Sequence, residues 1–236
     1  MKKAALILCI CTLLASLPWM NGKAETNTYT IRVDEFNRLK VNNDINVRYV
    51  CNTDSAGLAV FTCEDRFADA FIFSNKNGVL KISINTDYAR LWDYLPAVTV
   101  YSTFLTSAEN QSKLTLDVIG VPHCPELTFK QVGNGTINAS DLNATKIKAT
   151  IATGKGTINI DGEAEYAVLE MIGTGKIDAE NLEVKDVSCK VLGTGSITCW
   201  PIDKLSVSGL ASTTVYYKGE PATIKKSGVA KIEPLK

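Results

Sequence analysis

The feature that most constrains the fold of this chain is a repeat in its second half. The pattern Gly-x-Gly-x-Ile occurs at residues 133–137, 154–158, 173–177 and 193–197, and two degenerate copies end at Val215 and Ile232. The closing aliphatic residues are 21, 19, 20, 18 and 17 residues apart. A period near 20 with glycine at a fixed phase is typical of the coils of a β-solenoid.

A second regularity supports this interpretation, because apolar residues alternate with polar ones within each period. Alternation with a period of two places one set of side chains inward and the other in solvent. Two inward columns are predicted: Phe129, Ala149, Leu169, Cys189, Val207 and Ile224 in one, and Leu127, Ile147, Ala167, Val187, Leu205 and Ala222 in the other. We expect an all-β protein, a right-handed parallel β-helix, since parallel crossovers are nearly always right-handed.

The glycines themselves allow two interpretations. A corner between strands needs positive φ or a close backbone approach, and glycine permits both. A phosphate-binding loop would need a helix after the glycines. Here a strand pattern follows each pair, which favours corners.

The first half is less regular but also rich in β patterns. Strands are expected at 29–33, at 36–50 with a turn at 42–44, and at 58–63, 71–73, 79–84, 98–101 and 114–118. Residues 75–78 form a turn pattern, and residues 86–96 could hold one short helical turn. We predict one β-helical domain over 25–236, with an irregular part at 25–120 and regular coils at 121–236.

Residues 1–24 have the pattern of a secretory signal peptide. Lys2 and Lys3 precede an apolar run, and a small-residue cleavage pattern ends at Ala24. The run is shorter than the ~20 residues of a spanning helix. We therefore expect export, to the periplasm, the cell surface or the medium.

Cysteine usage points to no metal site. Five cysteines follow residue 24, without a Cys-x-x-Cys pair or a histidine cluster, so neither a metal nor a cofactor is predicted. Cys51 and Cys63 flank a turn pattern at 52–57, where they either bridge across a hairpin or stay free. The other cysteines have the character of small core residues.

Several of these patterns together resemble a known family. The residues are Phe36-x-x-Leu39-x-Val41, Ile45-x-Val47, the Gly-x-Gly-x-Ile repeats, and the segment 215–221. They resemble the putative auto-transporter adhesin head GIN domain family (DUF2807), exported β-helical proteins typical of Bacteroidetes. The resemblance covers Tyr29 to Lys236. It implies adhesion or surface binding and supplies no catalytic motif.

Catalysis is not favoured by the residues. His123 is the only histidine and lies in a predicted turn beside Cys124, whose side chain would point away from it. A polysaccharide-active β-helix enzyme would need clustered carboxylates. The candidates are Asp161, Asp178, Glu180 and Asp186, but they fall at different phases of the repeat. Zero formal net charge also argues against nucleic-acid binding.

A binding role is the expectation that remains. The loop at 87–96 holds Tyr88, Trp92 and Tyr94 beside Asp and Arg, a composition suited to a sugar or peptide ligand. The alternative for these aromatics is an apolar plug that caps the solenoid. We expect an adhesin or ligand-binding module whose partner is a carbohydrate or an envelope or host surface protein, with end-to-end homo-oligomers as an option. A lipid-binding protein is the further alternative, and it would need an open apolar cavity.

Overall fold

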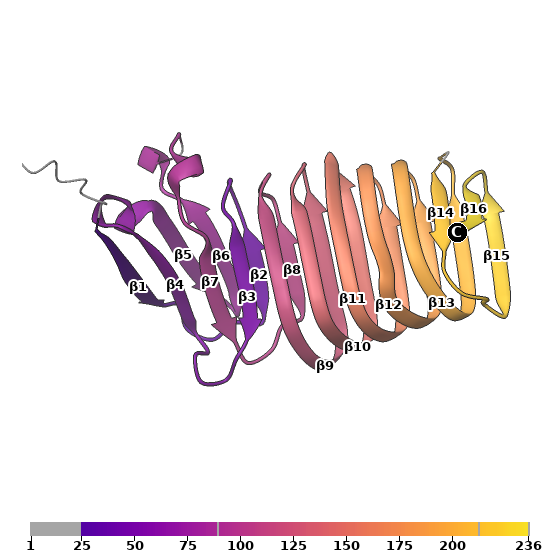
Figure 1. Cartoon of the computed structure of the whole chain (residues 1–236), viewed down its shortest axis with the longest axis horizontal. Helices are drawn as coiled ribbons and strands as arrows, with labels where there is room; N and C mark the ends of the chain where they lie inside the picture. The colour runs from indigo at the N-terminus through magenta and orange to yellow at the C-terminus, as the bar shows by residue number, and fades with distance from the viewer. Residues whose placement is uncertain (1–24, 89, 212, 236) are drawn as a thin grey trace, which may run out of the picture.

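The computed structural model describes residues 25–88, 90–211 and 213–235, so the expected signal peptide lies outside the described residues. They form a β-solenoid whose strands join into one 16-stranded sheet (Figure 1). The strands of the first half are β1 (Thr26–Arg32), β2 (Arg38–Val41), β3 (Val47–Cys51), β4 (Leu58–Glu64), β5 (Phe71–Lys76), β6 (Val79–Ile84), β7 (Val98–Ser102) and β8 (Ser107–Asn110). Three 3₁₀ helices accompany them: η1 (Asp65–Ala70), η2 (Thr86–Tyr88) and η3 (Trp92–Tyr94).

Long strands that bend around the core form the regular coils of the second half. They are β9 (Thr115–Val132), β10 (Thr136–Thr153), β11 (Lys155–Met171), β12 (Thr174–Val191) and β13 (Thr194–Gly209). The shorter β14 (Thr214–Tyr217), β15 (Thr223–Gly228) and β16 (Lys231–Pro234) complete the stack. All of these pair in parallel with the neighbouring coil, as the repeat predicted.

The register confirms the predicted columns through the regular coils. Ala149 pairs with both Phe129 and Leu169, and the column continues through Cys189 to Val207. The closing aliphatic residues also stack on one another, from Ile137 to Ile232. Leu169 is fully buried while its neighbour in the sequence, Glu170, faces outward.

The last coil departs from the predicted register by two residues. Ile224 pairs with Leu205 rather than with Val207, whose partner is Lys226, and Ala222 precedes the strand. Ile224 is 43% exposed, and every residue of β15 is exposed. Burial of one face is what fixes a strand's register, and no further coil covers β15, so the apolar pattern no longer decides the pairing.

Each regular coil has three runs. In β10 the first run is 136–139, a short middle run is 142–144, and the third run is 146–151, with register shifts at the bends. A glycine turn then leads into the next coil. The turns lie along one edge of the rod and the middle runs along the opposite edge (Figure 1).

Close approach between coils explains most of the turn glycines. A Cβ atom on Gly193 would lie 1.8 Å from the carbonyl oxygen of Gly173, and one on Gly195 would lie 1.9 Å from that of Gly175. Positive φ is required at Gly133 (94°) and Gly154 (76°). The glycines therefore stack on one another, and the backbone turns of successive coils touch.

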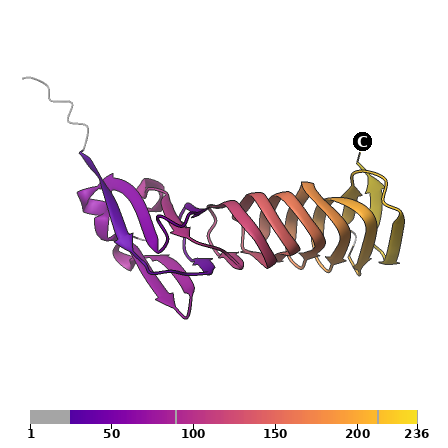
Figure 2. The same cartoon turned by 90° about the horizontal axis from the view of Figure 1, so that it is seen from below.

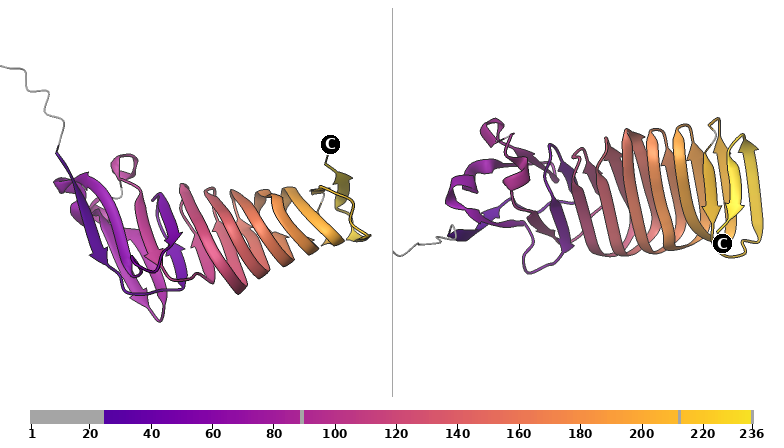
Figure 3. Two further views of the ribbon diagram at one scale, coloured as in Figure 1. Left: turned by 60° about the horizontal axis from the view of Figure 1, so that its bottom comes forward. Right: turned by 45° about the horizontal axis from the view of Figure 1, so that its top comes forward.

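The first half belongs to the same solenoid and closes its N-terminal end. β2 and β3 do not pair with each other: β2 pairs with β6 and β8, and β3 pairs with β7 and β9. β4 and β1 add antiparallel strands at the N-terminal end, where Phe61 packs against Phe71 with ring centroids 4.9 Å apart. This N-terminal cap covers one end of the core (Figure 2). Regular coils follow it without a break (Figure 3).

Of the two alternatives for Cys51 and Cys63, the structure shows the one without a bridge. Strand β7 lies between β3 and β4, so the two cysteines do not face each other across a hairpin. Cys51 pairs with Ser102 at one end of these strands, and Cys63 pairs with Asn27 toward the other. Both thiols are free, and the Cys51 Sγ donates to the carbonyl oxygen of Thr103 at 3.0 Å.

Candidate functional site

The predicted aromatic loop forms two short 3₁₀ helices, η2 and η3, in the first half of the chain. Tyr88 is half-buried and packs edge-on against Phe67, 6.4 Å between ring centroids, so it contributes to the cap. Tyr94 is 70% exposed and is available to a ligand. The side chain of Trp92 lies outside the described part of the chain. Ligand binding by this loop stays a prediction.

The carboxylates predicted for an enzyme do not all meet. Asp161, Asp178 and Glu180 line one shallow hollow of about 310 Å³ on the face formed by the first runs. Asp186 lines a separate hollow beside Tyr166 on the third runs. The predicted set is therefore divided between two faces of the rod.

In the first of these hollows the polar groups are engaged with one another. Asn159 donates to Asn138 at 2.8 Å, and Asn138 donates to Asp117 at 2.9 Å. The carboxylate of Asp178 forms an ion pair with Lys176, with 2.6 Å between Oδ2 and Nζ. Such a ladder of side chains stabilises the stacked strands and engages the asparagines and Asp178 of this hollow.

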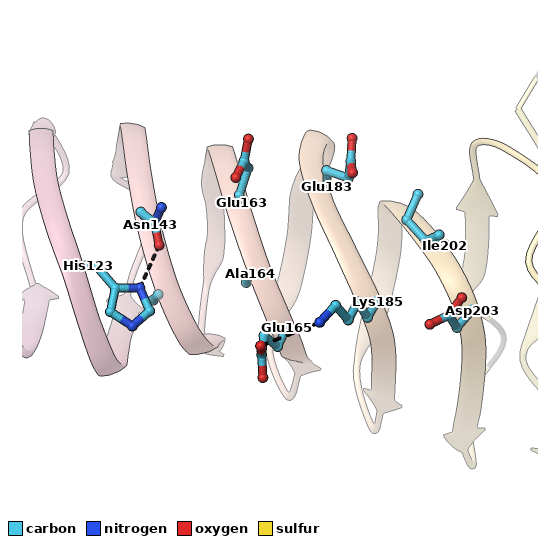
Figure 4. A pocket seen from close by; sticks show the side chains of 10 residues that line it. His123, Asn143, Glu163, Ala164, Glu165, Glu183, Lys185, Ile202 and Asp203 are labelled. Atoms are coloured by element: carbon cyan, nitrogen blue, oxygen red, sulfur yellow. Dashed lines mark hydrogen bonds and ion pairs between the residues drawn. The ribbon is translucent and has the colours of Figure 1, made fainter.

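A larger groove of about 390 Å³ runs along the middle runs of β9 to β13 (Figure 4). One row of its wall contains side chains from successive coils, and a second row lies beside it. The first row is His123, Asn143, Glu163, Glu183 and Ile202, and the second is Glu165, Lys185 and Asp203. Ala144 and Ala164 form part of the groove floor; Ala144 is buried in the core, and Ala164 is half-buried against it.

Hydrogen bonds and ion pairs fix part of this groove. The Nδ1 atom of His123 lies 2.7 Å from the Oδ1 atom of Asn143, and Lys185 Nζ lies 3.4 Å from a carboxylate oxygen of Glu165. His123 is exposed on strand β9, not in the turn predicted for it.

The remaining groove carboxylates are free. Glu163 and Glu183 are register partners on neighbouring coils, and both are exposed. Within the described residues neither they nor Asp203 takes part in an ion pair or a side-chain hydrogen bond. Like charges directly opposite each other are unfavourable in a sheet, so no structural benefit explains this pair. The groove thus presents unused hydrogen-bond acceptors in a fixed row.

The sequence analysis missed this groove, although the signal is present. His123, Asn143, Glu163 and Glu183 are spaced 20 residues apart, as are Glu165 and Lys185. Taken singly, Glu183 and Lys185 are indistinguishable from ordinary solvated charges, and only the period shared with the apolar positions marks them. Polar residues that recur at the coil period on one run must form a row on the surface.

Comparison with known proteins identifies the family to which the chain belongs. The family model described as "Putative auto-transporter adhesin, head GIN domain" matches residues 35–221. The chain belongs to this family. The match includes the N-terminal coils, the whole groove and most of the regular repeats of this head GIN domain. No curated protein matches the chain.

Solved structures share the fold. A "putative adhesin" from Bacteroides fragilis NCTC 9343 superposes with a TM-score of 0.78 at 22% identity, covering 89% of this chain and 97% of its own. A "putative lipid binding protein" from Parabacteroides distasonis ATCC 8503 gives 0.67 at 17% identity, with 91% and 98% covered. A "putative adhesin" from Parabacteroides merdae ATCC 43184 gives 0.65 at 22% identity, with the same coverage. Within the described residues of this head GIN domain, no helix is long and apolar enough to cross a membrane.

Proposed function

We propose that this chain is an exported, non-catalytic surface protein that binds a glycan chain along the groove of its middle runs. The observation that supports this proposal is the row of free side chains on successive coils. Coils repeat at about 4.8 Å, so the groove offers a free carboxylate on each of three successive coils, at Glu163, Glu183 and Asp203. A linear polymer of similar units can place one unit against each coil.

The chemistry of the groove suits hydroxyl-rich ligands. Carboxylates such as Glu163 and Glu183 accept hydrogen bonds from hydroxyl groups, and charged acceptors give stronger bonds than neutral ones. Asn143 and His123 supply mixed donors and acceptors.

A glycan-cleaving enzyme is the second candidate, because the same groove carries several carboxylates. Glycosidases use two such groups, one as an acid and one as a base or nucleophile. Incubation of the protein with the bound glycan, followed by analysis of reducing ends, separates the candidates: intact polymer supports binding alone, and shortened chains support the enzyme.

The hydrophobic-ligand alternative receives less support. It needs an open apolar cavity, whereas the groove and the hollow beside Asp178 open on the surface and carry several charged or polar side chains. The similarity to a "putative lipid binding protein" is a similarity of fold.

The test of the groove is a glycan-array screen, followed by titration of any ligand found. We expect a Glu163→Gln, Glu183→Gln double variant to bind at least about tenfold more weakly, because hydrogen bonds to charged groups contribute about 1.5–3 kcal/mol each. Glu220→Gln, an exposed carboxylate outside the groove, is the matched control. Trp92→Ala and Tyr94→Ala test the aromatic loop. Loss in the loop variants alone would move the site there, and an array without binding would refute the glycan proposal.

A further inference from the structure

The turns between the last coils carry a row of exposed aliphatic side chains. We name the row the aliphatic ridge; its members are Ile172, Leu192, Leu210 and Val229, exposed by 46%, 57%, 83% and 60%. Each comes directly after the third run of its coil, where the chain enters the turn. Exposure of this extent at consecutive coils is unusual, because a soluble surface seldom exposes aligned aliphatic residues.

Backbone hydrogen bonds hold the ridge in line. The amide of Leu192 donates to Met171 O at 2.8 Å, and that of Leu210 donates to Val191 O at 3.1 Å. Ile172 and Val229 make the equivalent bonds to the preceding coil, at 2.9 and 3.1 Å. The side chains are therefore fixed to the stacked coils and follow one edge of the rod, the edge of the turns in Figure 1.

The charge beside the ridge is positive. Lys190 lines a hollow of about 320 Å³ together with Leu192 and Leu210. Lys155 and Lys231, which begin β11 and β16 directly after turns, are also exposed, and within the described residues none of these three lysines has an ion pair. The nearby Glu170 is already paired with Lys148 at 3.3 Å.

We propose that the aliphatic ridge is a membrane-contact edge, which inserts its side-chain tips into the interface of a bilayer containing anionic lipid. Aliphatic tips with lysines beside them match the apolar interior and the negative headgroups of such a surface. A protein partner fits less well. A stable protein interface buries about 800 Å² on each side, and one row of four partly exposed aliphatic side chains offers far less.

This placement gives the rod a defined orientation. The ridge lies on the edge of the turns, and the groove lies on the middle runs at the opposite edge (Figures 1 and 4). A rod resting on its ridge would present the groove away from the lipid. The membrane contact is independent of the groove's ligand, so either proposal can fail without the other.

The experiment is sedimentation of the purified protein with vesicles of phosphatidylglycerol and phosphatidylcholine in equal parts, and with phosphatidylcholine alone. We expect binding to the anionic vesicles that falls at least about tenfold in a Leu192→Ser, Leu210→Ser double variant. Lys190→Ala should weaken it about fivefold, since each basic residue near the surface contributes about 1 kcal/mol. Ile72→Ser and Lys81→Ala, an exposed isoleucine and lysine at the N-terminal end, should bind as the unmodified protein does.

Thermal unfolding of every variant separates lost binding from lost structure, because these exposed residues should leave the melting temperature nearly unchanged. Absence of binding to anionic vesicles, or an equal loss in the Ile72 and ridge variants, would overturn the proposal. A change of mass in solution on replacing Leu192 and Leu210, measured without vesicles, would also overturn it and assign the ridge to contact with a second copy.

Discussion

Two buried side-chain amides at neighbouring positions of one core column differ in how many of their hydrogen-bonding groups have a partner. Asn110 pairs in register with Gln131, and the column continues through Ile151 and Met171. Asn110 donates to the carbonyl oxygens of Leu114 and Thr136 and accepts from Ser112 N. The Oε1 atom of Gln131 has no hydrogen-bond partner within the described residues. An unsatisfied buried polar atom is costly, whereas a satisfied one is costly to remove.

These two residues give opposite predictions. Gln131→Met should raise the free energy of unfolding by about 1 kcal/mol, because it replaces an unpaired oxygen with an apolar group of similar size. Asn110→Leu should lower it by about 2 kcal/mol or more, because it leaves backbone groups unpaired. Chemical denaturation measures both. Destabilisation of similar size in the two variants would show that Gln131 is as well satisfied as Asn110.

The stacked glycines lead to a second prediction for single residues. Gly193→Ala forces a Cβ atom against the backbone of Gly173, so we expect a loss of about 1–3 kcal/mol. Gly133→Ala meets no atom within 4 Å and is penalised only by its positive φ, about 1 kcal/mol. Melting temperatures of the two variants compare the effects. A larger loss at Gly133 would show that φ, rather than close approach, selects glycine in these turns.

Strand β1 pairs with β4 along its whole length, and the carboxylate of Asp65 adds side-chain hydrogen bonds to it. Asp65 accepts from Tyr29 OH at 2.6 Å and from Asn27 Nδ2 at 2.7 Å. These hydrogen bonds hold the pKa of Asp65 below its ordinary value of 3.8, and the bond to Asp65 raises the pKa of Tyr29 to about 12. Folding thus favours the ionised Asp65 and the neutral Tyr29.

The attachment of β1 should therefore depend on pH at both extremes. The contribution of Asp65 is present above 3.8 and disappears as the pH falls through its lower folded pKa; that of Tyr29 is present below 10.0 and disappears as the pH rises through about 12. We expect the protection factors of the β1 amides, which compare their exchange rates with those of an unstructured peptide at the same pH, to fall in acid, and to be lower at neutral pH in Asp65→Asn. Asp54→Asn, an exposed carboxylate outside this cluster, is the control. Equal protection of β1 in Asp65→Asn and the unmodified protein would contradict this role.

At the level of elements, the sequence could predict the register of those strands that have one buried face. The columns from Phe129 to Val207 follow from alternation, because each strand has one buried face. The shift in β15 could not be predicted in this way, since nothing covers it. The pairing of β3 with β7 also depends on contacts between distant segments, which is why the sequence left open whether Cys51 and Cys63 form a bridge. The groove was predictable in principle from the period of its polar residues.

The whole rod has unequal ends. The N-terminal end is closed by the N-terminal cap, but at the other end β15 pairs, among the described residues, only with β13 and exposes all six of its residues. An open strand edge invites pairing with another chain, and lysine or proline on the edge opposes it. Lys225 and Lys226 lie on β15, and Pro234 ends β16. These residues therefore oppose end-to-end association, which the sequence left as an option.

We therefore expect the protein to be a monomer and its Lys225→Thr, Lys226→Val variant to associate through β15. Removal of both charges leaves Thr223 to Gly228 as an uncharged edge that can extend the sheet into a second molecule. Light scattering over a range of concentrations measures the change. A variant with Lys81→Val and Lys155→Thr loses the same charge away from β15 and should stay monomeric. Association in both variants would attribute the effect to net charge, and association of the unmodified protein through β15 would show that the end is an interface rather than a protected edge.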